Sequence, residues 1–248
     1  MKQPNVVSAD QWLAARKSLL EKEKAFSRLR DELTAARQAM PWERVEAEYR
    51  FAGPDGEQTL ADLFGSCSQL IVYHFMFETD WTEGCKSCSF VTDHIEPSIV
   101  HVAQRDVNVV LVSRAPLQKL EDFRQRMGWK LHWVSSEGSD FNRDYQVSFT
   151  QDEIEQHKVY YNYRSDRSFP STEGPGISTF CKDEDGTVYH TYSSYQRGLE
   201  NFIGAYTLLD IVPKGRAEED LLYGMHWLRL KDAYGDVEFA DPYAGKLR

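Results

Sequence analysis

Two apolar stretches on either side of a cysteine pair most constrain the fold of this chain. Residues 69–77 are almost continuously apolar or aromatic, and residues 107–112 are apolar at five of six positions. Runs of this length are typical of strands buried on both faces, as in the centre of a parallel sheet. Between them lie Cys85, Cys88 and the helical pattern of residues 90–103. This order predicts a β-α-β unit with the cysteines at the start of its helix.

The segments that follow continue the alternation of strands and helices. The sequence predicts a helix over 117–127 after Pro116, a weaker strand over 130–134, a hairpin of strands 177–182 and 187–192, a possible strand over 159–163 and a closing helix near 199–209. Residues 44–51 alternate strictly between apolar and charged, which predicts a half-buried strand. The expected fold class is α/β, a mixed sheet with helices on both faces, extended by a long N-terminal helix and a C-terminal segment.

The N-terminal region has the pattern of one long amphipathic helix. Ser8 and Gln11 form a capping-box pattern, and apolar residues recur at helical spacing until Pro41. A bare apolar stripe of that length favours aggregation, so we expect it to be covered by the main domain or, in a homodimer, by a second subunit. We expect three parts: residues 1–41 as the helix, 42–213 as the main domain, and 214–248 as an extension docked on it.

Charge and cysteine content narrow the class of function. The 248-residue chain has 29 Lys and Arg against 39 Asp and Glu, a formal charge of −10, so nucleic acid and anionic membrane surfaces are not expected partners. We find no signal-peptide pattern and no apolar run of membrane-spanning length, and expect a cytoplasmic protein. In a reducing compartment, a close cysteine pair is typical of a catalytic or metal-binding site.

The spacing of Cys85 and Cys88 fits dithiol chemistry. A cysteine at a helix N-terminus meets free backbone N–H groups and the positive end of the helix dipole, both of which favour the reactive thiolate. Lys86 adds a nearby positive charge, and Trp81 is suited to shield the sulfur from bulk water. We therefore expect Cys85 to attack a disulfide and Cys88, one helical turn later, to resolve the mixed disulfide.

The motifs are similar to those of the thioredoxin superfamily. The resemblance is carried by the strand 70–77, by Trp81–Phe90, and by Gly176–Phe180 followed by Asp185–Val188. More closely, the whole chain, to the Met225-His226-Trp227 tail, resembles a bacterial domain-of-unknown-function family of predicted dithiol-disulfide oxidoreductases. The resemblance implies a protein or small-molecule thiol or disulfide as the substrate.

The thioredoxin resemblance also implies a residue that faces the cysteine pair across a groove. Thioredoxins carry a cis-proline there, and the comparable place in this sequence is Ser178, with Pro175 upstream. The dipeptide between the cysteines is Lys86-Ser87, where thioredoxins have Gly-Pro. We expect Trp81, Thr82, Lys86 and Ser178 to shape the site around Cys85 and Cys88.

Two other functions fit the same residues. Thr82 and Cys85 have the Thr-x-x-Cys spacing of peroxiredoxins, with Arg114 and Arg164 as candidates for the arginine of a thiol peroxidase and Glu78 where those enzymes have proline. A non-catalytic binding or scaffold protein that retains the fold is the second alternative. Structural zinc would need two more ligands; His94 and His101 are seven residues apart, unlike common zinc pairs. No metal and no nucleotide cofactor are expected.

Overall fold

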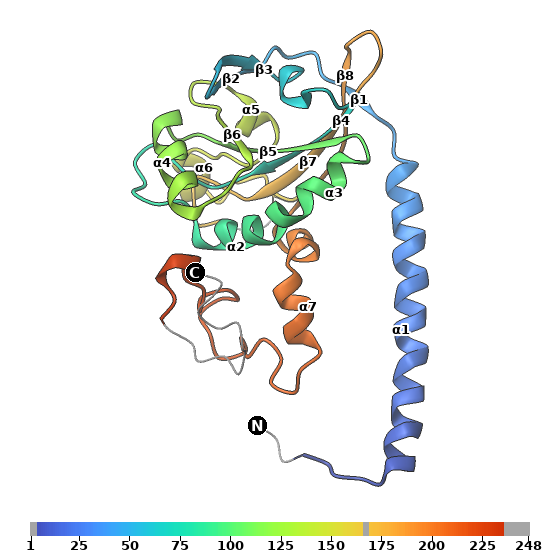
Figure 1. Cartoon of the computed structure of the whole chain (residues 1–248). Coiled ribbons are helices and arrows are strands. Elements are labelled where there is room, and N and C mark those ends of the chain that lie inside the picture. Colours follow the sequence, from blue (N-terminus) through green and yellow to red (C-terminus); the bar gives the residue numbers. More distant parts are fainter. Residues whose placement is uncertain (1–3, 166–168, 236–248) are drawn as a thin grey trace.

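The computed structural model of the chain describes residues 4–165 and 169–235, and within them one mixed sheet of eight strands (Figure 1). The strands are β1 Glu43–Arg44, β2 Arg50–Gly53, β3 Gly56–Thr59, β4 Gln69–His74, β5 Val107–Ser113, β6 His132–Ser135, β7 Gly176–Lys182 and β8 Val188–Tyr195. The helices are α1 Ala9–Gln38, α2 Lys86–Ile95, α3 Ile99–Ala103, α4 Leu117–Met127, α5 Phe141–Asp144, α6 Gln151–Glu155 and α7 Gly204–Asp210. Short 3-10 turns cover η1 Asp62–Phe64, η2 Glu96–Ser98, η3 Gln196–Phe202 and η4 Lys231–Ala233.

The centre of the sheet is the predicted β-α-β unit followed by a hairpin. The strand order is β1-β8-β7-β4-β5-β6-β2-β3; β4 pairs in parallel with β5 and antiparallel with β7. Helix α2 is the first part of the crossover from β4 to β5, and Pro97 lies in η2, where the helical run breaks before α3. The expected mixed sheet with helices on both faces is confirmed.

Alternate residues of β4 face two different cores. Tyr73 belongs to the core that α2, α4 and α7 cover, and Phe75 continues it with a ring centroid 4.7 Å from that of Trp133. Val72 belongs to the opposite core, to which η1 and α5 contribute. The period of two along a strand therefore assigns each β4 side chain to one side of the sheet.

The single strand predicted over residues 44–51 is wrong. The segment contributes to two separate strands: β1 pairs with β8, whereas β2 lies between β3 and β6. In the connecting residues, the Val45 N–H donates to the Val188 carbonyl at 2.9 Å and the Tyr49 hydroxyl donates to Asp144 at 2.7 Å. An alternating pattern predicts which side chains are buried, but it does not show whether the residues form one strand or parts of two strands with different partners. Residues 159–163 likewise form no strand, only an isolated bridge between Tyr161 and Arg164.

Helix α1 forms as predicted but is not covered by the domain. The Ser8 side chain caps it in the expected capping box, and none of its residues is buried. Phe26 remains 67% exposed, and Figure 1 shows the helix standing beside the domain. At its C-terminal end the Arg37 guanidinium lies 5.4 Å from the centre of the Tyr192 ring, a cation–π contact. The domain therefore does not shield the apolar stripe.

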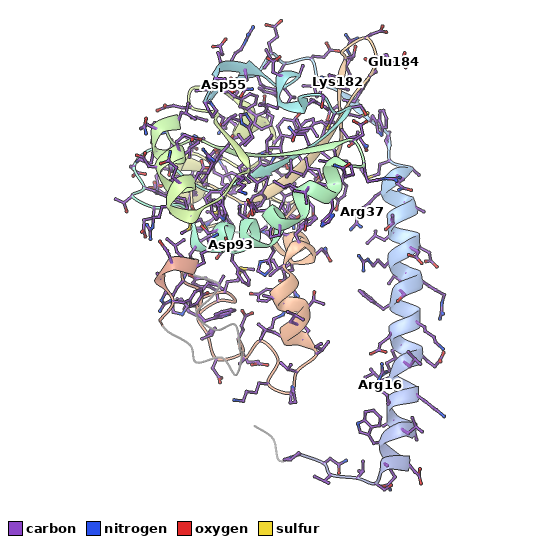
Figure 2. All side chains as sticks on the ribbon, viewed as in Figure 1. Arg16, Arg37, Asp55, Asp93, Lys182 and Glu184 are labelled. Atoms are coloured by element: carbon purple, nitrogen blue, oxygen red, sulfur yellow. The ribbon has the colours of Figure 1, made fainter. Side chains whose placement is uncertain are left out.

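The C-terminal segment packs beneath α2. Leu228 and Leu230 are buried, and Lys231 forms an ion pair of 2.9 Å with Asp93. Figure 2 labels Asp93 on the side of α2 that faces this segment. Glu218 accepts hydrogen bonds from the Trp227 indole at 2.7 Å and the Tyr206 hydroxyl at 2.8 Å. The remainder of the expected 214–248 extension, residues 236–248, lies outside the described residues. No helix of the described chain is long and apolar enough to cross a membrane.

Candidate active site

Cys85 stands at the junction between the central strand and α2. Its N–H donates to the Met76 carbonyl at 3.1 Å, and its own carbonyl accepts from Ser89 at 2.9 Å, so Cys85 is the N-cap residue of the helix. The cap side chain lies beside the N–H groups of the first turn, which have no partner within the helix. The predicted position of the first cysteine at a helix start is therefore what the structure shows.

The surroundings of Cys85 favour its thiolate. The pKa of Cys85 is lowered to about 7, chiefly by the interaction of its sulfur with the neighbouring Cys88 thiol. Burial opposes this shift, while the N–H groups of Cys88 and Ser87 and the charge of Lys86 add to it. Cys85 is only partly buried, and both thiols are free.

Cys88 has the opposite environment. It is 1% exposed, and its pKa is raised well above the ordinary value, first by burial and then by its hydrogen bond and charge interaction with Cys85. The hydroxyl of buried Tyr73 lies beside it and favours its thiolate. Among the described residues that hydroxyl has no hydrogen-bond partner of good geometry. The pair thus combines a partly buried thiol that ionises readily with a fully buried one that does not.

The loop before Cys85 is fixed by close packing and by Lys119. A Cβ on Gly84 would lie 2.7 Å from the Phe75 ring and 2.9 Å from the Phe123 ring, so only glycine fits there. The Lys119 ammonium donates to the carbonyls of Thr79 at 2.6 Å and Trp81 at 2.9 Å. These contacts hold the loop that presents Cys85.

The predicted neighbours of the pair differ in what they contact. Trp81 is half-buried and packs against the core that contains Cys88. Lys86 donates from its ammonium to the His226 carbonyl at 3.0 Å, which ties the first turn of α2 to the C-terminal segment. Thr82 is exposed, and no hydrogen bond among the described residues joins its hydroxyl to a thiol.

The expectation that Ser178 faces the cysteines is wrong. Ser178 pairs with Val72 in the β7–β4 register, and its buried hydroxyl bonds to His74 at 2.8 Å and to Ser193 at 2.8 Å. Cross-strand partners point to the same face of a sheet, so Ser178 shares the face of Val72, opposite that of Cys88. The β4–β7 register decides this, and it cannot be obtained from the spacing along the chain.

Tyr73 and Tyr161 are the tyrosines that interact with Cys88. Burial raises the pKa of Tyr161 and the charge of Cys88 adds to the increase, while the Tyr161 hydroxyl donates to the Pro175 carbonyl. No cis peptide bond occurs in the described chain, so the bond before Pro175 is trans. The position of Tyr73 near the cysteines could have been predicted from the sequence. Tyr73, Phe75 and Phe77 are alternate residues of one extended segment and therefore point to the same face, which α2 covers.

Arg114 and Arg164, the two candidates for the arginine of a thiol peroxidase, lie in different environments. The Arg114 guanidinium forms ion pairs with Glu173 at 2.9 Å and with Glu78 at 3.3 Å, and Glu78 accepts a hydrogen bond from Thr172 at 2.6 Å. Burial raises the pKa of Glu173 to about 7, against the lowering effects of Ser148 and Arg114. Arg114 is thus held by two carboxylates at the carboxyl end of β5. Arg164 lies on an exposed loop, where its carbonyl accepts from the Tyr161 N–H.

A cavity of about 580 Å³ adjoins the N-terminus of α2. Its walls come from the loop before Cys85, from Lys86, from the end of α4 and from the C-terminal segment; the lining residues are Asp80, Trp81, Thr82, Glu83, Gly84, Lys86, Arg126, Arg229, Leu230 and Ala233. This volume is within the range of small-molecule sites in proteins. Within the described residues, no three His, Cys, Asp or Glu side chains are gathered as a metal site. His94, considered above as a zinc ligand, accepts a hydrogen bond of 3.1 Å from the Ala205 N–H at the start of α7.

The strand order β5-β4-β7-β8, with α2 after β4 and a cysteine pair at its start, defines a thioredoxin-like protein. The chain belongs to a family described as bacterial protein of unknown function (DUF899), whose model matches residues 1–234. A search of curated proteins finds no match.

Solved structures with distant similarity include redox proteins of several bacteria. Peroxidoxin BcpB from Mycobacterium tuberculosis aligns with a TM-score of 0.45 and 13% identity over 70% of this chain and 98% of its own. Peroxiredoxin Q from Xanthomonas campestris aligns at 0.41 and 14%, over 67% and 96%. A putative thiol:disulfide interchange protein DsbE from Chlorobium tepidum aligns at 0.37 and 15%, over 67% and 98%. Similarity at this level is shared by peroxidases and a disulfide interchange protein and does not distinguish between their activities.

Proposed function

We propose that the protein is a thiol–disulfide oxidoreductase in which Cys85 is the nucleophile and Cys88 the resolving thiol. The observation that carries the proposal is the difference between the two cysteines. Cys85 is only partly buried and its pKa is lowered to about 7, whereas Cys88 is fully buried with a raised pKa. An attacking thiol is most effective when its pKa is near the ambient pH.

The reaction follows from this arrangement. The Cys85 thiolate attacks one sulfur of a disulfide; the substrate S–S bond breaks, a mixed disulfide forms and the first substrate thiolate leaves. Cys88 then loses its proton and attacks the Cys85 sulfur, which releases the second substrate thiolate. Each released thiolate takes up one proton, so two thiols form while the enzyme dithiol becomes the Cys85–Cys88 disulfide. Tyr73, beside Cys88, favours the thiolate that the second step requires.

A pH series of thiol alkylation and a disulfide-reduction assay test the proposal together. Iodoacetamide should modify Cys85 in the wild-type protein with a midpoint near pH 7, and Cys85→Ser should abolish this fast phase. The reduced protein should convert a model disulfide to two thiols and itself become oxidised. An alkylation midpoint above 8.5 together with no disulfide reduction would exclude the proposed enzyme.

The thiol peroxidase alternative is separated by a different assay. No hydrogen bond in the described part of the chain joins the Thr82 hydroxyl to the Cys85 thiol, and Arg114 is held by Glu173 and Glu78, so we do not expect either residue to activate a peroxide at Cys85. Peroxide consumption should therefore be slow relative to disulfide reduction in the wild type. A peroxidase that survives Cys88→Ser but not Cys85→Ser would favour the alternative.

The non-catalytic scaffold alternative makes a separate prediction. It would leave both thiols unreactive while α1, exposed along its whole length, mediates assembly. A homodimer that forms through α1 is compatible with either function, because the helix lies apart from the cysteine site. Light scattering of the full chain and of a variant without residues 1–40 tests whether α1 carries that assembly.

A further inference from the structure

The cavity beside Cys85 has a charge pattern unlike that of the protein as a whole. The chain carries a formal charge of −10, yet three cations, Lys86, Arg126 and Arg229, line the cavity against two carboxylates, Asp80 and Glu83. Lys86, the first residue of α2, is part of its wall, and the dipole at this end of the helix favours anions. A locally positive site on an acidic protein is selective for negative ligands.

Two of these cations have unused hydrogen-bonding capacity. Arg126 is engaged by Glu83 and by Asp232, the latter at 2.7 Å. Lys86 and Arg229, in contrast, donate to backbone carbonyls, those of His226 and Leu228, each at 3.0 Å. Neither has a carboxylate partner within the described part of the chain. An ammonium has three donors and a guanidinium five, so both can bind a further oxygen ligand.

The cavity also adjoins the backbone on either side of Cys85 and is limited in size. Gly84 and Lys86, the neighbours of Cys85 in the chain, both line it although Cys85 itself does not, so a molecule held there lies against the turn that carries Cys85. The C-terminal segment closes one wall and is anchored by the Asp93–Lys231 and Arg126–Asp232 ion pairs. A volume of about 580 Å³ is large enough for a small molecule.

We infer that the physiological substrate is a low-molecular-weight disulfide or thiol that carries carboxylate groups, bound through Lys86 and Arg229. This inference rests on the proposed thiol–disulfide exchange at Cys85. The cations hold the carboxylate while the Cys85 thiolate attacks the substrate sulfur, and the atoms and electrons balance as in the two-step exchange above.

Three symmetrical disulfides of similar length test the inference. They are 3,3′-dithiodipropionate, which is anionic, bis(2-hydroxyethyl) disulfide, which is neutral, and cystamine, which is cationic. Rate constants for oxidation of the reduced wild-type protein are measured in single turnover at low and high salt. The anionic disulfide should react about tenfold faster than the neutral one at low salt, cystamine should be slowest, and salt should reduce the difference.

Substitutions at Arg229 locate the preference. Arg229→Gln should reduce the ratio of anionic to neutral rates to within about threefold of unity, and Arg229→Lys should restore most of it. Arg28→Gln, on α1 and far from the cavity, removes the same charge and should leave the ratio unchanged. Asp80→Asn removes a carboxylate from the cavity wall and should increase the ratio.

The outcomes separate this inference from the proposed function. Reaction with all three disulfides at similar rates overturns the substrate assignment and leaves the oxidoreductase intact. The same holds for a preference that survives Arg229→Gln. If Arg229→Gln fails to fold, a wild-type ratio that does not depend on salt overturns the assignment by itself. No reaction with any of the three disulfides refutes the proposed function, and the substrate assignment with it.

Discussion

The interaction of the Cys88 thiol with Cys85 gives the sharpest test of how the proposed nucleophile, Cys85, is activated. It is the largest influence that lowers the pKa of Cys85, ahead of the Ser87 and Cys88 N–H groups and the Lys86 charge. Cys88→Ala removes the donor, whereas Cys88→Ser replaces it with a hydroxyl that can still donate. The two variants should therefore differ in the pKa of Cys85, although neither can resolve a mixed disulfide.

The magnitude follows from the strength of such a bond. A hydrogen bond to a charged group contributes about 1.5–3 kcal/mol. One pKa unit corresponds to about 1.4 kcal/mol, so Cys88→Ala should raise the pKa of Cys85 by roughly one to two units. In the wild-type protein about half of Cys85 is thiolate at pH 7, because its pKa is about 7. In Cys88→Ala the thiolate fraction should be roughly fivefold to fiftyfold lower at that pH.

The assay is the absorbance of the thiolate near 240 nm, together with the rate of alkylation, from pH 5 to pH 10. Cys88→Ser should have a midpoint within half a unit of the wild type, and Cys88→Ala a clearly higher one. Circular dichroism establishes that all three proteins are folded. If Cys88→Ala keeps the wild-type midpoint, the hydrogen bond from Cys88 is not what lowers the pKa of Cys85, and the reasoning fails.

Three further predictions concern the surroundings of the pair. Gly84→Ala places a methyl group against the rings of Phe75 and Phe123, which should cost about 1–3 kcal/mol in the free energy of unfolding by urea; an unchanged midpoint would contradict this. Tyr73→Phe removes the hydroxyl that favours the Cys88 thiolate, so resolution of the mixed disulfide at Cys85 should slow about fivefold. The mixed disulfide should then accumulate, which mass spectrometry of acid-quenched samples would detect. Resolution at the wild-type rate would refute this role of Tyr73. The pKa of Glu173 is raised to about 7 in the folded protein, so its ionisation should reduce stability as pH rises from about 4.5 to 7, with no further change above. Glu173→Gln should remove about 2–3 kcal/mol of the stability difference between pH 4.5 and pH 8, and an equal difference in both proteins would exclude this assignment.

The sequence by itself determined the elements that local patterns specify. The continuous apolar runs located β4 and β5, the capping box located the start of α1, and Pro116 and Gly128 bracketed α4. It also determined that Cys85 begins a helix after a buried strand. These features depend on residues close together in the chain, which is why hydrophobic periodicity and capping preferences predict them.

The tertiary structure decided which side chains meet. The β4–β7 register turned Ser178 to the face of Val72, away from Cys88, and the strand pairing divided residues 44–51 between two parts of the sheet. The cavity beside the N-terminus of α2 exists only because Arg229, Leu230 and Ala233 lie against α2 and α4. Contacts of this kind join residues far apart in the chain, and no spacing within the sequence records them. The dithiol is therefore a property of the local sequence, and what it binds is a property of the fold.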